Sequence, residues 1–393
     1  MNMTQKEVTN VSSRAGQLSP SLTFAIDSKV KKMKSEGIEV LNLGLGEPDA
    51  DTPEHIKAAT MGALDAGFTK YTAAAGIPEL RAAISEKLKK DNSLSYDASQ
   101  IVVTCGAKQA CYNALLAVVE PGEEVMIPSP YWVSYPEMVK LVGGVPIAVP
   151  TSAEEGYKLT PELFREYMSP LTKMVILNSP NNPTGTVYTE NELAALAEVA
   201  MEEGIMILSD EIYEKLTYDG AKHVSTASFS KEIYNNTITV NGFSKPYAMT
   251  GWRLGYVAAP APIAKAIENI QGHSTSNATS FAQQGALAAY KAPQDCVEEM
   301  LNEYAQRRTK VMEALDGMRK VSYVKPMGAF YILLNISRTG MKSTQFCEKF
   351  LNEEKVALVP GIAFGDDDTV RLSYAASMEC LEQALSRLSR FCS

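Results

Sequence analysis

Short apolar runs rich in β-branched residues recur through the middle of the chain, with helical patterns between several of them. These runs occupy residues 101–104, 125–127, 146–149, 174–177, 205–208 and 237–240. Runs that stay apolar at successive positions predict strands buried on both faces of a sheet. The capping box from Thr189 to Glu192 predicts a helix start between two of them. The pattern therefore predicts an α/β fold whose mainly parallel sheet is covered by helices on both faces.

The two ends of the chain follow a different pattern. Residues 1 to about 17 are polar and predict an arm, and residues 40–43 predict a short strand. Beyond residue 290, a long charged helix is expected from 297 to about 318, followed by an apolar run at 327–334 and a final helix from Glu379. This shift predicts a second, smaller α/β lobe.

Composition narrows the class of protein. The chain has 393 residues, of which 45% are hydrophobic, enough for a large core in two lobes. A net charge of -9 argues against nucleic acid or an anionic membrane as the main partner. The N-terminus has no signal-peptide core and no apolar stretch is long enough to span a bilayer, so we expect a cytoplasmic protein. The six cysteines form no CxxC pair and the three histidines are far apart in sequence, so we expect free thiols and no metal site.

Lys245 is the first candidate for chemistry. It follows the strand-like run 237–240, and Arg253 follows eight residues later. A lysine amine can form a Schiff base with an aldehyde, and an arginine can grip a phosphate with two nitrogens. Pyridoxal 5′-phosphate is an aldehyde cofactor that carries a phosphate. A surface lysine beside a salt-bridged arginine is the alternative interpretation.

Three further segments favour the cofactor. The segment 178–185 follows the run 174–177, Asp210 and Tyr213 follow the run 205–208, and Arg371 lies near the C-terminus. In open α/β sheets, such groups gather at the carboxyl edge of the strands. Together these segments supply the groups that a pyridoxal enzyme acting on amino acids needs.

The chain resembles the class I/II pyridoxal-phosphate-dependent aminotransferases of fold type I, and within them the bacterial-type aspartate aminotransferases. Three motifs occur in the family's order: Asn-Pro-Thr-Gly from Asn182, Asp-x-x-Tyr from Asp210, and Ser-Lys-x₅-Gly-x-Arg-x-Gly from Ser244. The resemblance implies a large cofactor-binding domain at 48–290 with a mainly parallel seven-stranded sheet sandwiched by helices. It also implies a smaller α/β domain at 291–393, with residues 1–47 as an arm and a segment that packs with this domain.

The resemblance also implies roles at the cofactor ring. Lys245 would form the Schiff base and then move a proton from the substrate Cα. Asp210 would face the pyridine nitrogen and keep it protonated, while Tyr213 and Asn182 would hydrogen-bond the ring oxygen O3′. Trp132 would stack on the ring, unless it is a structural tryptophan and a neighbouring tyrosine, Tyr131 or Tyr135, is the nearer ring.

For the phosphate, residues 105–109 lie between a strand and a helical pattern, where a helix N-terminus supplies N–H donors. By resemblance, Gly106, Ala107 and Lys108 would cradle the phosphate with Arg253. Many relatives carry a serine where this chain has Gly242, and Ser244 would partly replace it. Tyr71 resembles a tyrosine that reaches the phosphate of the neighbouring subunit, so a homodimer with shared active sites is expected.

For the substrate, Arg371 would grip the α-carboxylate with help from Asn182, and Gly46 would let the backbone approach the same group. Residues 271–283 contain no arginine that could bind a distal carboxylate from the partner subunit. By resemblance to the bacterial-type group, three other residues would serve: Lys108, Ser21 and Thr23.

These residues predict an aspartate:2-oxoglutarate aminotransferase acting on amino acids and 2-oxo acids. Prephenate, aromatic or alanine transamination, or β-elimination on the same scaffold, stays open because Lys245, Asp210 and Arg371 serve all of them. A ligand-sensing regulator would need an added DNA-binding module, and a nicotinamide oxidoreductase would need a GxGxxG after its first strand. The sequence favours neither.

Overall fold

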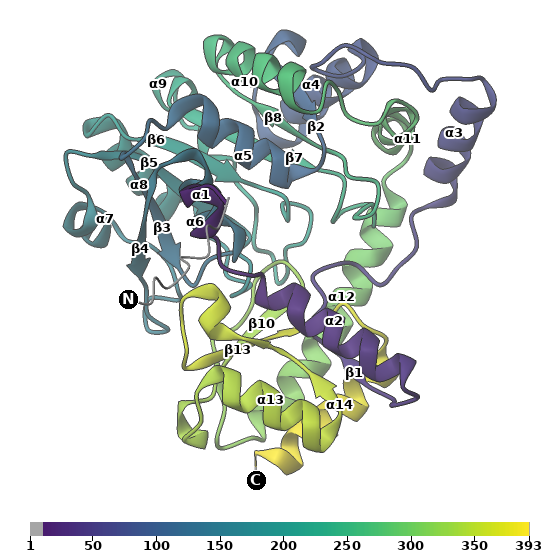
Figure 1. Cartoon of the computed structure of the whole chain (residues 1–393), viewed down its shortest axis with the longest axis vertical. Helices are drawn as coiled ribbons and strands as arrows, with labels where there is room; N and C mark the ends of the chain where they lie inside the picture. Colours follow the sequence, from purple (N-terminus) through teal and green to yellow (C-terminus); the bar gives the residue numbers. More distant parts are fainter. Residues whose placement is uncertain (1–10, 393) are drawn as a thin grey trace, which may run out of the picture.

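The structure, a computed structural model, describes residues 11–392, which form two lobes (Figure 1). The larger lobe is built on a seven-stranded sheet with the strand order β2-β8-β7-β6-β5-β3-β4. These strands are β2 (Ile101–Thr104), β3 (Glu124–Ser129), β4 (Val145–Pro150), β5 (Thr172–Asn178), β6 (Met206–Asp210), β7 (Thr237–Gly242) and β8 (Gly255–Ala258). All neighbouring strands are parallel except β8, which is antiparallel to both β2 and β7. The predicted mainly parallel seven-stranded sheet is therefore confirmed.

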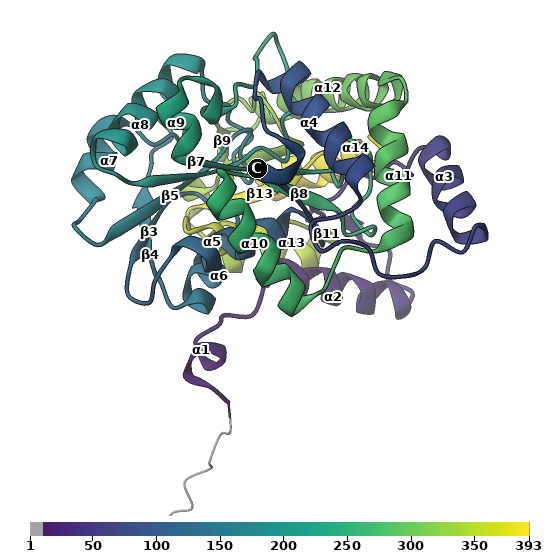
Figure 2. The ribbon, with the colours of Figure 1, turned by 90° about the horizontal axis from the view of Figure 1, so that it is seen from above.

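Helices cover both faces of this sheet (Figure 2). One face packs against α5 (Ala107–Val118), α6 (Ser134–Val142) and α10 (Ala261–Ser274). The other packs against α4 (Pro78–Asn92), α7 (Pro161–Tyr167), α8 (Glu190–Glu202), α9 (Lys231–Asn235) and α11 (Ser280–Lys291). Helix α3 (Glu54–Asp65) packs on α11.

Strand alternation explains this arrangement. In β5, Met174 and Ile176 belong to the core on one face, and Val175 and Leu177 belong to the core on the other. A strand apolar at every position is therefore buried on both sides, as its sequence predicts. The capping box from Thr189 to Glu192 is also present, at the start of α8.

The smaller lobe contains an antiparallel sheet of order β12-β13-β10-β9. Its elements are β9 (Ser322–Tyr323), β10 (Tyr331–Asn335), β12 (Val359–Pro360), β13 (Thr369–Ser373), α13 (Ser343–Glu354) and α14 (Met378–Phe391). The long helix α12 (Asp295–Asp316) leads into it from the larger lobe (Figure 1). Single 3₁₀ turns lie at Ala98–Gln100, Thr226–Ser228, Ser337–Thr339 and Gly361–Phe364.

The N-terminal segment contacts both lobes. Helix α1 (Ser13–Gly16) lies beside α6 of the larger lobe (Figure 1). Helix α2 (Leu22–Ser35) and strand β1 (Leu41–Asn42) lie against the smaller lobe, and β1 pairs in parallel with β11 (Val356–Ala357). Val30 and Val40 share a small core with Leu351 and Ala357. The domain boundaries near residues 47 and 290 stay a prediction, and residues 1–10 of the expected arm lie outside the described residues.

Within residues 11–392, no helix combines the length and the apolar character that crossing a membrane requires.

Candidate active site

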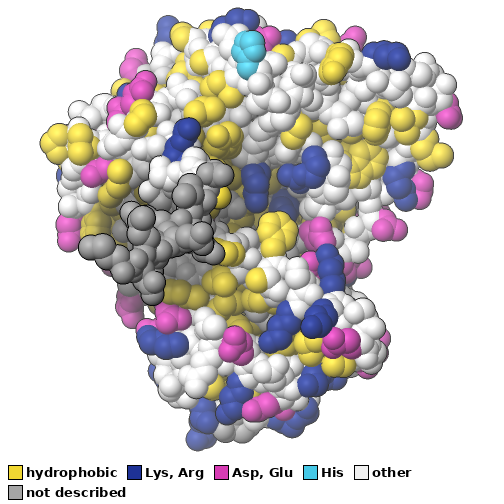
Figure 3. All heavy atoms as spheres, in the orientation of Figure 1, with side chains coloured by type: hydrophobic (Ala, Val, Ile, Leu, Met, Phe, Trp, Pro, Cys, Tyr) yellow, Lys and Arg dark blue, Asp and Glu magenta, His cyan; other side chains and the backbone are white. Residues whose placement is uncertain are grey.

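A cavity of about 620 Å³ lies between the lobes, and basic side chains are visible in the hollow there (Figure 3). Its walls come from the carboxyl ends of β5 and β6, the start of α5, the loop after β7, strand β13 and the N-terminal segment. Most of the predicted site residues line it: Ser21, Thr23, Gly46, Ala107, Lys108, Trp132, Asn182, Asp210, Tyr213, Ser244, Lys245, Arg253 and Arg371. Two do not. Gly106 lies behind Arg253, and Tyr71 is 89% exposed on the surface of its own chain.

Lys245 lies in the loop after β7, with its amine in the cavity. Its Nζ donates a hydrogen bond to the carbonyl oxygen of Gly46. The pKa of Lys245 is lowered to about 8, chiefly by burial; the charges of Arg371 and Arg253 also lower it, and the charge of Glu47 opposes the shift. Because only a neutral amine can attack an aldehyde or accept a proton, this environment suits a nucleophile and base.

Asp210 is the last residue of β6, and its carboxylate faces the cavity. Tyr135 donates a hydrogen bond to Oδ2 at 2.7 Å, and the backbone N–H of Ile212 donates to Oδ1 at 3.2 Å. Burial raises the pKa of Asp210, and these two donors oppose that rise. Among the described residues, no lysine, arginine or histidine forms an ion pair with Asp210. A buried carboxylate without a cationic partner is unfavourable as an anion, so a cationic group of a ligand would bind favourably here.

Arg371, in β13, is a buried cation, in contrast to the buried carboxylate of Asp210. Its Nη1 donates to Asn182 Oδ1 and its Nη2 to Gly44 O, both at 2.9 Å, while its guanidinium carbon lies 4.4 Å from the ring centre of Tyr331. The buried Nε has no hydrogen-bond partner, and no carboxylate in the part of the chain that the structure describes pairs with this guanidinium. A buried, uncompensated cation with a spare donor is a site for a carboxylate ligand.

The start of α5 and Arg253 form a second anion site. Gly106 caps the helix at φ 83°, and a Cβ there would lie 2.5 Å from Arg253 Nη2, so only glycine permits this approach. A Cβ on Gly255 would lie 2.3 Å from the amide nitrogen of Ala107, so β8 also needs glycine where it meets the helix start. The first turn of α5 contains no acidic residue. Free amides, the helix dipole and Arg253 therefore all favour an anion here.

Gly242 has a physical reason to differ from the serine expected by resemblance. A Cβ at this position would lie 2.9 Å from Gly255 Cα and 3.1 Å from Leu254 O. A serine would therefore need a shift of the neighbouring backbone. Ser244 is buried and lines the cavity, so its hydroxyl is available on the same loop.

The mouth of the cavity contains Lys108, Ser21 and Thr23. Lys108 Nζ lies 4.9 Å from the ring centre of Trp132 and 5.8 Å from that of Phe24. Burial, and then the charge of Arg253, lowers the pKa of Lys108. Ser21 Oγ and Thr23 Oγ1 are 2.8 Å apart. No carboxylate among residues 11–392 forms an ion pair with Lys108, so its charge is available to a ligand.

Two tyrosines of this site were not assigned their contacts from the sequence. Tyr135 was considered only as a stacking ring, yet its hydroxyl binds Asp210. Tyr331 lies in the apolar run 327–334, which was assigned no site role, yet its hydroxyl lies 2.9 Å from that of Tyr213 and its ring packs against the guanidinium of Arg371. The sequence offered one local signal for Tyr135. It lies three residues after Trp132, at the start of α6 (Ser134–Val142), close to a residue already predicted to line the site.

Comparisons with known proteins agree with this geometry. Residues 38–388 match the family model described as aminotransferase class I and II. The chain is 48% identical to an aspartate aminotransferase of Geobacillus stearothermophilus, over 96% of this chain and 98% of that protein. It is also 48% identical to a probable aspartate/prephenate aminotransferase of Aquifex aeolicus, over 97% and 98% of the two chains. The solved structure of an aspartate aminotransferase from Thermus thermophilus with maleate is similar, with a TM-score of 0.93, 43% identity, and coverage of 97% and 99%.

Proposed function

Because the chain belongs to the class I and II aminotransferase family, we propose that it transfers the amino group of L-aspartate to 2-oxoglutarate, giving oxaloacetate and L-glutamate. It is an aminotransferase of a family that depends on pyridoxal phosphate. The finer assignment, to aspartate, depends on the charges in the cavity.

The residues present fit pyridoxal phosphate. The cofactor has a basic ring nitrogen, an aldehyde and a phosphate. The cavity offers a buried carboxylate without a cation at Asp210, an amine of lowered pKa at Lys245, and the anion site formed by α5 and Arg253. When bound, the cofactor supplies an aldehyde that captures amino groups and a ring that withdraws electrons from the substrate Cα.

Each residue then has a defined task. Arg371 and Asn182 bind the α-carboxylate and so orient the Cα–H bond toward Lys245. The amine of Lys245 would take the proton from the substrate Cα and deliver it to the carbon that the cofactor's aldehyde supplies. Asp210, which accepts a hydrogen bond from Tyr135, would keep a proton on the ring nitrogen, and Tyr213 and Asn182 would donate hydrogen bonds to the ring oxygen. Burial of Asp210, Tyr213 and Arg371 strengthens these interactions, because the surrounding protein screens charge less than water does.

The observation that carries the choice of aspartate is a pair of uncompensated cations on one cavity. Arg371 is buried on the small-lobe side, and Lys108 lies at the mouth beside Trp132 and Phe24. A dicarboxylic amino acid has one carboxylate for each. A monocarboxylic donor such as alanine would leave Lys108 without a partner, so it would lack one charge-assisted bond that a dicarboxylic donor makes.

Prephenate is the second candidate. Relatives named aspartate/prephenate aminotransferase are 48% and 44% identical to this chain. In this cavity, the rings of Trp132 and Phe24 flank Lys108, so the mouth offers apolar contact for a ring beside a cation for its carboxylate.

A homodimer with shared active sites is part of the proposal. Tyr71 is exposed and away from the cavity of its own chain, and Met61 and Leu64 on α3 are also exposed. A second copy covering this region would bring Tyr71 to the partner's phosphate site. Mixing Lys245→Ala chains with chains substituted at Tyr71 alone tests this, because one site of each mixed dimer would combine an intact Lys245 and Arg253 with an intact Tyr71 from the other chain. Recovered activity is expected, and an active monomer in sedimentation would remove the shared site.

The experiment that tests the function is a panel of amino donors with 2-oxoglutarate as acceptor. We expect the highest kcat/KM for aspartate, with alanine at least tenfold lower, because loss of a charge-assisted hydrogen bond costs about 1.5–3 kcal/mol. Prephenate is tested as acceptor with glutamate as donor. A preference for aromatic or neutral donors would contradict the aspartate assignment.

A further inference from the structure

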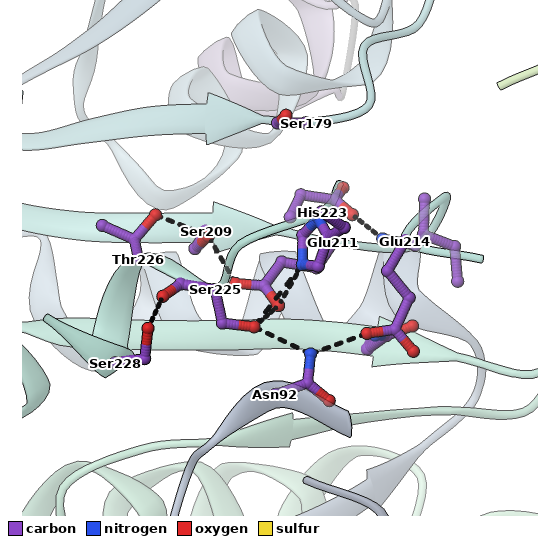
Figure 4. A network of polar contacts seen from close by, with 12 residues as sticks. Asn92, Ser179, Ser209, Glu211, Glu214, His223, Ser225, Thr226 and Ser228 are labelled. Atoms are coloured by element: carbon purple, nitrogen blue, oxygen red, sulfur yellow. Dashed lines mark hydrogen bonds and ion pairs between the residues drawn. The ribbon is translucent and has the colours of Figure 1, made fainter. Parts of the chain in front are cut away.

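A buried polar cluster surrounds Glu211 and Glu214, and Figure 4 shows Asn92, His223 and Ser225 beside them. Lys87 also binds this cluster, and we call the six residues the Glu211 network. Ser225 Oγ donates to Glu211 Oε2 at 2.5 Å, and His223 Nε2 lies 3.0 Å from the same oxygen. Asn92 Nδ2 donates to Ser225 Oγ at 2.8 Å and to Glu214 Oε2 at 2.7 Å. These bonds form one continuous chain through the interior.

The network and the active site share one short segment of backbone. Asp210 and Tyr213 point into the cavity, whereas Glu211 and Glu214 point into the network. Glu211 directly follows the last residue of β6, so strand alternation sends its side chain to the face opposite Asp210. Any movement of the two glutamates would therefore move the two cavity residues.

The network ties this segment to distant parts of the larger lobe. Lys87 and Asn92 belong to α4, and Lys87 Nζ binds both Glu214 and Asn92 Oδ1. Ser225 and His223 come from the loop before the 3₁₀ turn Thr226–Ser228. Burial alone would raise the pKa of Glu214, but the charges of Lys87 and His223 lower it to about 2. Both ends of the segment after β6 are thus held by buried, charge-assisted bonds.

Stability alone is a weak explanation for this arrangement. A buried ion pair is often no more stabilising than apolar residues of similar volume, whereas a satisfied polar network fixes one geometry. A metal site is also a poor fit. Ligand atoms of Glu211, Glu214 and His223 lie within 4.8 Å of one another, but Lys87 already supplies a cation to Glu214.

We propose that the Glu211 network positions Asp210 and Tyr213 for the cofactor, with Glu211 and Ser225 as positioning residues behind the cavity. This inference rests on the proposed function, because it assigns Asp210 and Tyr213 to the cofactor ring. It predicts that loosening the network weakens cofactor binding and slows turnover without changing how the substrate is held by Arg371.

Two serines offer a matched test. Ser225 and Ser343 are both fully buried, and each donates to a carboxylate at 2.5 Å, Ser225 to Glu211 and Ser343 to Asp367. Ser343 begins α13 in the smaller lobe, outside the cavity. The dissociation constant of pyridoxal phosphate from each apoenzyme, the melting temperature, and kcat and KM for aspartate are measured for Ser225→Ala and Ser343→Ala.

Ser225→Ala should weaken cofactor binding about tenfold and lower kcat about tenfold, with KM nearly unchanged. Effects of about this size are known for residues that orient the side chains in direct contact with a bound group. Ser343→Ala should lose comparable thermal stability, but its cofactor dissociation constant and its kcat should stay within about twofold of the wild-type values. Ser225→Thr, which keeps the hydroxyl, should restore most of the cofactor affinity. Equal effects of the two alanine variants on cofactor affinity would overturn the proposal.

Two further measurements cover the remaining outcomes. If Ser225→Ala does not fold, Glu211→Gln, which keeps the shape and removes the charge, should show the same weakening of cofactor binding, and normal affinity there would overturn the proposal. Loss of cofactor affinity on chelation, restored by a divalent cation, would assign the network to a metal instead. A wild-type protein that binds the cofactor but does not transaminate aspartate would refute the proposed function and leave the comparison of affinities valid.

Discussion

At the floor of the cavity, Asp210, Tyr213 and Arg371 are each at most 4% exposed, whereas at its mouth Phe24 is 66% exposed. The floor residues lie on or directly after strands of the two sheets, and each has defined hydrogen bonds. The mouth residues, Ser21, Thr23, Phe24 and Lys108, lie at helix starts and have few partners. The buried floor therefore carries the groups for what every amino-acid substrate shares, and the exposed mouth carries the groups for what varies between substrates.

The largest effect is expected from removing the amine at the floor. Lys245→Ala should lower turnover of every donor by about 10⁴-fold, because no other side chain lining the described cavity replaces a neutral amine there. The protein should still bind pyridoxal phosphate through Arg253 and α5. Steady-state assays with aspartate and alanine check this, and normal turnover with either donor would remove Lys245 from the chemistry.

Asp210 gives the next largest effect. Asp210→Ala should lower kcat about 10²–10³-fold for all donors, since the ring nitrogen loses its charged partner. Asp210→Glu should lose far less, because it retains a carboxylate. Pre-steady-state rates with aspartate and alanine measure both, and wild-type rates in both variants would assign Asp210 to a structural role.

The lowered pKa of Lys245 predicts a pH dependence at the floor. A pKa of about 8 instead of the usual 10.5 leaves about 300-fold more neutral amine at pH 7. Labelling of Lys245 in the apoenzyme by an amine-specific reagent should therefore rise with pH and level off above about 8. Mass spectrometry of the labelled peptide follows this, with exposed Lys265 as the control, and a midpoint near 10.5 for Lys245 would contradict the account.

At the mouth, effects should depend on the donor. Lys108→Ala should lower kcat/KM for aspartate and glutamate about ten- to a hundredfold, and for alanine much less, because only the acidic donors lose a charge-assisted bond. Lys265→Ala, on α10 outside the cavity, is the matched control. Equal losses on acidic and neutral donors would mean that Lys108 only supports the loop.

The smallest effect is expected from the hydroxyls. Thr23→Val keeps the shape and removes one hydrogen-bonding group, so kcat/KM for aspartate should fall about two- to tenfold. Ser21→Ala should behave similarly, since the two hydroxyls are in contact. If Thr23→Val leaves every donor unaffected, the N-terminal segment does not contact the distal carboxylate.

Much of the fold could be predicted from the sequence because it is encoded locally. Six of the seven strands of the large sheet are apolar at successive positions, and Asp210 and Asn182 follow strands whose carboxyl ends meet at one edge. Strand β8 was not among the predicted runs, since it begins at Gly255, which is needed for close packing and breaks the apolar pattern. Its antiparallel direction is set by pairing with β2 and β7.

The contacts behind the site could not be predicted in the same way. Tyr213 and Tyr331 are 118 positions apart in sequence, and Asn92 and Glu214 are 122 apart. No local pattern distinguishes such a tyrosine from a core aromatic, or a buried glutamate from a surface one. These side chains acquire their roles only when distant elements pack together.

A single-turnover measurement tests the central claim most directly. The cofactor-loaded protein is mixed with L-aspartate in the absence of any 2-oxo acid, and its absorption spectrum and the released oxaloacetate are followed. The account predicts loss of the pyridoxal band, growth of the pyridoxamine band and one oxaloacetate per active site, with the spectrum reversed by 2-oxoglutarate. A spectrum that does not change with aspartate, or release of ammonia in place of oxaloacetate, would contradict it.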